Sequence, residues 1–184
     1  MSAPAPGSEA WLALGREEAI DPQRPIIDPH HHLWLAGTNP AAPWPASRPA
    51  YLLGDLWGDT NSGHHIVKTV FIECRAAARP DGPDHLKPVG ETEFVVPIAR
   101  ASRDIGGGAV IAGIVAHADL RGGPLLDEAL DEHAMAAGPM FFKGIRHSGA
   151  RDPHPEHLAI PGRGAEGLYA DPALRAGVAR ICKL

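Results

Sequence analysis

The sequence predicts an α/β fold in which parallel strands alternate with helices, as in part of a (β/α) barrel. Short apolar runs alternate with stretches of helical periodicity, which is typical of parallel strands joined by crossover helices. The runs are almost continuously apolar, as expected for a sheet that is covered on both faces. Each run also ends in ionisable residues, and a barrel places its site at the carboxyl ends of its strands. An open doubly wound sheet binds ligands at the same edge, but its Gly-rich first turn does not occur here.

Four strands are expected, and their order in space should follow their order in the chain, with right-handed crossovers. A short apolar run marks each one, and Pro or Gly residues cluster between the runs. The predicted strands lie near residues 26–30, 66–73, 109–116 and 140–146.

Helices are expected between these strands. Helical spacing over residues 91–105 and 125–137 predicts helices after the second and third strands. Asp171-Pro172 predicts the start of a helix after the fourth strand, because Asp favours the N-cap and Pro favours the first turn. The first strand is followed by a long loop with one helical turn around 52–57. Ser8 is expected to cap a short amphipathic helix through Ile20, so that residues 1–24 form an N-terminal extension.

Length, charge and cysteine content limit the possible classes of protein. The 184 residues suffice for one domain with a hydrophobic core. A net charge of −5 gives no electrostatic support to nucleic-acid binding. No apolar run is long enough to cross a membrane, and the first residues lack the basic and apolar regions of a signal peptide. Cys74 and Cys182 cannot form a disulfide framework, so a reducing cytoplasm is the expected location.

The most informative segment is Pro25–Trp34, in which the first strand ends in three consecutive histidines. Side chains alternate along a strand, so His30 and His32 share a face, with Cα atoms roughly 6.5–7 Å apart, whereas His31 points to the other face. Two imidazoles that converge in this way can bind one divalent metal or one substrate oxygen, and catalytic zinc takes about three protein ligands. We therefore predict that His30 and His32 form a functional pair. A polar loop that happens to be rich in His is the alternative.

Glu73 and Arg146 follow the second and fourth strands. Glu73 can be a further metal ligand, a group that orients one of the histidines, or a proton carrier. An ion pair with Arg75 or Lys68 is the alternative. The Arg146 guanidinium suits bidentate binding of a carboxylate, and a structural salt bridge is the alternative.

His117 and Asp119 follow the third strand and share a face. They can contribute to the site, or Asp119 can simply cap the following loop. Surface solvation best explains the histidines that fall in predicted helices or loops, which are His64, His65, His133, His154 and His157.

Five segments carry a family resemblance. Ile27–Trp34 is close to an Asp-x-His-x-His-x-Trp pattern, and Thr69–Cys74, Gly90–Phe94, Gly113–Leu120 and Lys143–His147 support it in combination. Together they resemble the amidohydrolase superfamily, in particular its amidohydrolase-related branch of TIM-barrel metal-dependent hydrolases, which includes lactonases and decarboxylases.

The resemblance implies a hydrolase that uses water to open a lactone or a similar cyclic ester or amide of an acidic substrate. A non-oxidative decarboxylase on the same scaffold is the alternative. The resemblance also implies a divalent metal on His30 and His32, zinc or else manganese, or no metal at all, since the resembling lactonases include both kinds. Glu73 then has a catalytic role, and Arg146 and His117 bind a small, carboxylate-bearing substrate.

Only half of such a barrel is expected from this sequence. A complete barrel has eight β/α units and about 250 residues, whereas four strands are predicted, so residues 25–184 should form the N-terminal half. The family's further His and its last-strand Asp have no counterpart in the sequence. We therefore expect the 184 residues to be inactive as a hydrolase by themselves. We also expect self-association through the open half-barrel, which leaves free edges and an uncovered apolar face. A catalytically inactive half-barrel that acts only in interactions is the alternative.

Overall fold

The computed structural model describes residues 3–4, 8–15, 17–37, 48–151 and 164–183. At its centre is a four-stranded parallel sheet with the order β1-β2-β3-β4. The parallel pairing and the sequential order confirm the predicted arrangement of strands. The strands are β1 (Pro25–His31), β2 (His65–Ile72), β3 (Val110–Ala116) and β4 (Phe142–Ile145).

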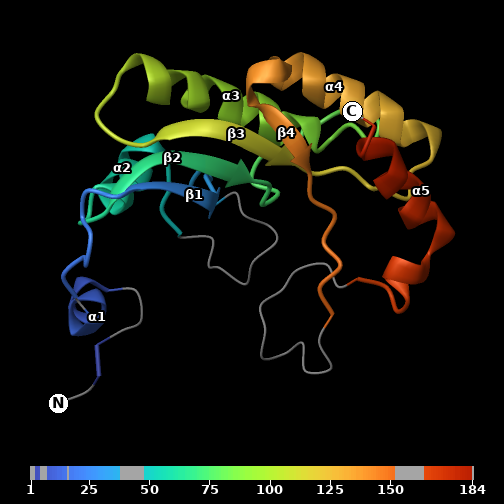
Figure 1. Ribbon diagram of the computed structural model, residues 1–184. Helices are drawn as coiled ribbons and strands as arrows, with labels where there is room; N and C mark the ends of the chain where they lie inside the picture. Colours follow the sequence, from blue (N-terminus) through green and yellow to red (C-terminus); the bar gives the residue numbers. More distant parts are fainter. Residues whose placement is uncertain (1–2, 5–7, 16, 38–47, 152–163, 184) are drawn as a thin grey trace.

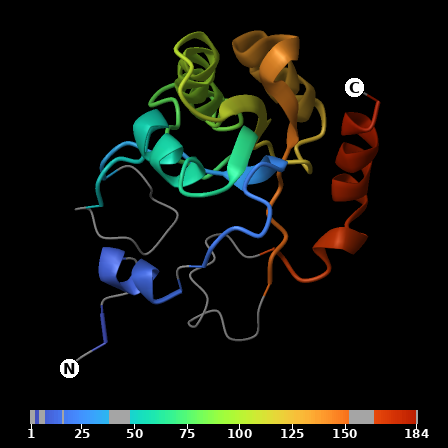
Figure 2. The same cartoon turned by 60° about the vertical axis from the view of Figure 1, so that its left-hand side comes forward.

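Helices alternate with the strands and lie mainly on one side of the sheet. Figure 1 shows α3 and α4 packed across one face, while α5 lies beyond β4, a position that Figure 2 confirms from a second direction. We call the face opposite α3 and α4 the open face. The helices are α1 (Glu9–Leu12), α2 (Leu53–Thr60), α3 (Val89–Asp104), α4 (Pro124–Phe141) and α5 (Pro172–Ile181), with 3₁₀ turns η1 (Ala13–Gly15) and η2 (Leu168–Ala170). Within the described residues, no helix is both long and apolar enough to cross a lipid bilayer.

The main hydrophobic core lies between the sheet and α3 and α4. Phe71 of β2 pairs in register with Ile114 of β3, and both side chains are buried in this core with Val95 of α3. The next residues in each strand, Ile72 and Val115, also pair in register. Because side chains alternate along a strand, Ile72 and Val115 lie on the open face.

Two predicted helix ends are confirmed by backbone geometry. The helical pattern of α4 is interrupted at Gly138, which has φ 66° and ψ 173° and so cannot continue an α-helix. At the start of α5, Asp171 Oδ1 accepts a hydrogen bond of 2.8 Å from the Ala173 amide, as expected for an N-cap followed by proline.

The predicted helix from Ser8 to Ile20 is wrong. Ser8 Oγ does accept a hydrogen bond from the Trp11 amide, but α1 ends at Leu12 and η1 ends at Gly15. The apolar side chains of this segment are exposed, so they do not supply the packing that stabilises a short helix.

The fold predicts a steep dependence of stability on Phe71. This side chain is 1% exposed at the centre of the core, so Phe71→Ala should lower the free energy of unfolding by about 3–5 kcal/mol in urea denaturation. Ile105→Ala is the matched control, because Ile105 is 69% exposed and its truncation should change stability by less than about 0.5 kcal/mol. Equal effects of the two substitutions would contradict the placement of the core.

Candidate functional site

His30 and His32 meet at the carboxyl end of β1, as their spacing predicts. Their Nε2 atoms are 3.1 Å apart and their rings pack edge to face. His32 Nδ1 lies 2.8 Å from the carbonyl oxygen of Ile72, which can only accept a hydrogen bond. The proton of neutral His32 is therefore on Nδ1, and the Nε2 lone pair faces His30.

His31 lies on the other face of the sheet, which confirms the predicted alternation. Its ring packs edge-on against Phe71, with centroids 5.8 Å apart, and it is 7% exposed. Burial lowers the pKa of His31 to about 4, because a charged imidazole loses its hydration in the core.

The histidine pair fits two positions of a metal site. Tetrahedral zinc with Zn–N bonds of about 2.0–2.1 Å keeps two ligand nitrogens roughly 3.3 Å apart, close to the 3.1 Å between the Nε2 atoms. Among the described residues, however, no group of three His, Cys, Asp or Glu side chains could hold a metal ion. The pair is thus compatible with part of a zinc site, and a further protein ligand would have to come from outside the described residues.

Glu73 and Arg146 form an ion pair that joins the carboxyl ends of β2 and β4. Arg146 Nε donates to Glu73 Oε1 at 2.8 Å, and Arg146 Nη2 donates to the Glu73 carbonyl oxygen. Glu73 is 3% exposed, and its Oε2 has no hydrogen-bond partner among the described residues. The alternative of an ion pair with Arg75 or Lys68 is wrong, because Arg146 takes that place.

His32 lies within the electrostatic influence of this ion pair. Burial is the main reason why the pKa of His32 is lowered, and the charges of His30 and Arg146 lower it further. The hydrogen bond to Ile72 and the charge of Glu73 act in the opposite direction. His32 is therefore held mainly neutral near pH 7, which is the form that binds metals or accepts protons.

The third strand contributes His117. Its Nδ1 lies 3.0 Å from the carbonyl oxygen of Arg146, so Nδ1 donates to that oxygen, and in the neutral form of the ring Nε2 is an acceptor. Asp119 accepts a 2.9 Å hydrogen bond from the Arg121 amide, which confirms that it caps the following turn. Leu120 donates its amide proton to His147 Nδ1 at 3.2 Å.

A hollow of about 510 Å³ lies beside these side chains. His30, Arg146 and His147 form its polar wall, and Ile72 and Val115 of the open face contribute to its apolar wall with residues of η2 and α5. His30 and Arg146 therefore border the same hollow.

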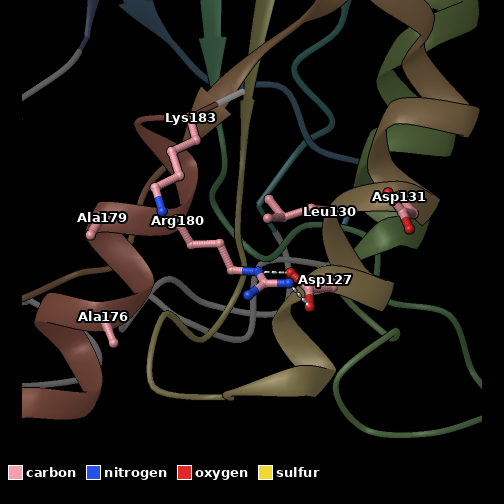
Figure 3. Close-up of a pocket in the computed structure, with 7 residues that line it drawn as sticks. All are labelled: Asp127, Leu130, Asp131, Ala176, Ala179, Arg180 and Lys183. Carbon is pink, nitrogen blue, oxygen red and sulfur yellow. Dashed lines mark hydrogen bonds and ion pairs between the residues drawn. The ribbon is translucent and has the colours of Figure 1, made fainter.

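A separate hollow of about 440 Å³ lies between α4 and α5. Figure 3 shows the Arg180 guanidinium facing the Asp127 carboxylate across it, and this ion pair ties the two helices together. Because Arg180 and Asp127 neutralise each other, we take the hollow at the strand ends as the candidate site.

Glu91 also lies at the carboxyl end of the sheet, although the periodicity around it predicts only a helix. It is 4% exposed in the first turn of α3, and its Oε1 accepts hydrogen bonds from the amides of Cys74 (3.0 Å) and Ala76 (2.8 Å). Burial raises the pKa of Glu91, while the two amides lower it. A Cβ at Gly90 would lie 2.5 Å from the Arg79 amide nitrogen, so glycine permits α3 to approach this turn. The sequence Gly90-Glu91 is therefore the feature from which the contact between α3 and the turn after β2 could have been predicted.

His133 is not solvated, in contrast to the prediction. It is fully buried in α4, where Nδ1 lies 2.8 Å from Thr92 Oγ1 and Nε2 lies 3.0 Å from the His117 carbonyl oxygen. A helix can bury a polar residue when both of its ring nitrogens find partners. His64 and His65 are exposed as predicted, and His154 and His157 lie outside the described residues.

Comparison with known proteins gives one informative similarity. No family model matches the chain, and no solved structure matches it. The chain is similar to the uncharacterized protein y4mH of Sinorhizobium fredii (strain NBRC 101917 / NGR234), with 34% identity over 136 residues. The similar part covers 67% of this chain and 39% of that protein, so the chain spans about two fifths of that relative's length.

The buried imidazole of His31 predicts a loss of stability in acid. Above pH 6.5 both the folded and the unfolded chain carry neutral His31, whereas below it the unfolded chain binds a proton that the folded chain takes up only near pH 4. Between pH 6.5 and 4 the natural chain should therefore lose up to about 3 kcal/mol more unfolding free energy than His31→Leu. Urea denaturation across this range measures the difference.

His64→Leu is the matched control, because His64 is exposed and its loss should leave the pH dependence of the natural chain unchanged. If His31→Leu showed the same pH dependence as the natural chain, His31 would not be the buried neutral group described.

Proposed function

We propose that this chain is the N-terminal half of a (β/α)-barrel hydrolase of the amidohydrolase type. The whole barrel would open a lactone, or a similar cyclic ester or amide of an acidic substrate, by attack of water. The observation that carries the proposal is the His30–His32 pair, whose Nε2 atoms lie 3.1 Å apart where β1 ends. Its chemistry is that of a metal-binding or carbonyl-binding pair.

The architecture supports this proposal. Parallel strands in sequential order, with α3 and α4 covering one face, are compatible with the first units of a barrel repeat. The 136 aligned positions make up 39% of the relative in Sinorhizobium, which therefore has roughly 300–350 residues. This length is enough for a full barrel, which needs about 250 residues. The free edges of β1 and β4 and the open face are where we propose that the rest of a barrel, or a second copy, associates.

The residues of the site divide the chemistry between them. Under this proposal His30 and His32 hold a zinc or manganese ion, or they polarise the substrate carbonyl directly through His30 Nε2–H. A bound ion would lower the pKa of a water molecule to near neutrality. The Ile72 carbonyl fixes the orientation of His32, as groups behind a metal ligand commonly do. Glu73 Oε2 is the carboxylate oxygen left to accept a proton, because Oε1 is bound by Arg146.

Zinc binding by the chain tests the pair directly. The tightest zinc site should weaken at least about tenfold in His30→Ala and in His32→Ala, because each substitution removes one of the two nitrogens. Competition with a chromogenic chelator gives the affinity. His64→Ala is the matched control, since it removes an exposed histidine at the opposite edge of the sheet and should leave the tightest site unchanged. Unchanged zinc affinity in both pair variants would remove the metal from the proposal.

A hydrolysis assay on the same preparations tests the catalytic part. The 184-residue chain should show no lactone hydrolysis above background, because the described residues offer a metal only the His30–His32 pair and leave it under-coordinated. Turnover that persists in both His30→Ala and His32→Ala would place the activity elsewhere and contradict the proposed site.

A further inference from the structure

Arg75 has an unusual backbone conformation at the end of β2. It lies two residues beyond Glu73 and has φ 61°, and it is the sole non-glycine with positive φ in the described part of the chain. For a residue with a long side chain this left-handed region is uncommon and costs about 1–2 kcal/mol. The surrounding structure must therefore hold Arg75 in place.

Glu91 is the group that holds it. The amides on either side of Arg75, those of Cys74 and Ala76, both donate to the same oxygen, Oε1 of Glu91. Glu91 is 4% exposed and is fixed in the first turn of α3. A buried carboxylate with two charge-assisted hydrogen bonds can offset the strain of one left-handed residue.

The two arginines at the carboxyl end of the sheet differ in whether a carboxylate neutralises them. Arg146 is committed to Glu73 through both Nε and Nη2. The Arg75 side chain is exposed, and within the described residues no hydrogen bond or ion pair involves it. Arg75 is therefore a cation at the strand ends that is available to an incoming anion.

We propose that Arg75, rather than Arg146, binds the carboxylate of the substrate, and that Glu91 is the positioning residue that fixes the Arg75 turn. The identification of this anion as the substrate's carboxylate rests on the proposed function. Arg146 then serves to hold Glu73, and the fork of the Arg75 guanidinium binds the carboxylate by paired charge-assisted hydrogen bonds.

Titration with glutarate, a simple dicarboxylate, tests the proposal on the chain itself. In ¹⁵N-detected spectra of the labelled chain, glutarate should shift the amides of residues 73–76 and the Arg75 Nε–H signal at millimolar concentration. Arg75→Gln should raise the Kd at least about tenfold, because it removes the charged fork. Arg103→Gln is the matched control, since Arg103 is an exposed arginine in the last turn of α3, at the other end of that helix from Glu91.

Arg75→Gly separates the charge from the backbone. Glycine adopts positive φ without strain, so this variant should bind glutarate as weakly as Arg75→Gln while its Tm stays equal to or above that of the natural chain. Glu91→Gln, which keeps an accepting oxygen, should retain both glutarate affinity and the strong intraresidue amide–Hα NOE of a left-handed Arg75. Glu91→Ala should lose both, with circular dichroism reporting whether the chain is still folded.

Three results would overturn the proposal: no Kd change in Arg75→Gln, an equal loss in Arg103→Gln, or loss of glutarate binding only when Arg146 is replaced. Failure here and failure of the proposed function are distinguishable, because zinc binding depends on the His30–His32 pair and should be the same in Arg75→Gln. Unchanged zinc affinity with no role for Arg75 would leave the hydrolase proposal intact. If glutarate binding required Arg75 but the chain bound no zinc, Arg75 would still be an anion-binding residue, whereas metal binding by the His30–His32 pair would be contradicted.

Discussion

The buried ion pair between Glu73 and Arg146 organises the carboxyl end of the sheet. A carboxylate that is 3% exposed requires a compensating charge, and Arg146 supplies it from β4 while also binding the carbonyl of Glu73. Because β3 lies between β2 and β4, this one pair spans three strands. The side chains with functional potential are attached to the same backbone: His32 binds the carbonyl of Ile72, and His117 binds that of Arg146.

The features predicted correctly from the sequence are those that follow from local periodicity. Alternation along a strand places His30 and His32 together and sends His31 to the core, and no tertiary information is needed for this. The sequential parallel order follows similarly from apolar runs that alternate with helices. The helix predicted from Ser8 to Ile20 failed because its apolar face has nothing to pack against, and periodicity does not report on packing.

The features that the sequence did not predict are ion pairs and hydrogen bonds between elements that lie far apart in the chain. The partner of Glu73 lies 73 positions away, directly after a strand that does not pair with β2, and no spacing rule connects the two. Glu91 and His133 look like helix surface residues, yet each is buried with hydrogen bonds to the ends of β2 and β3. The first turn of α3 shows the same principle. Glu91 and Glu93 bind Ala76 and Arg79 of the segment that follows β2. Thr92, between them, binds His133 of α4.

A double-mutant cycle between Glu73 and Arg146 is the most direct test of this organisation. Urea denaturation of the natural chain, Glu73→Gln, Arg146→Gln and the double variant gives the energy that couples the two side chains. A coupling of at least about 1–2 kcal/mol is expected, since either single substitution leaves a charge without its partner in a largely dry site. If the two effects added to within about 0.5 kcal/mol, the ion pair would not hold β2 and β4 together. The candidate site would then lack the framework described here.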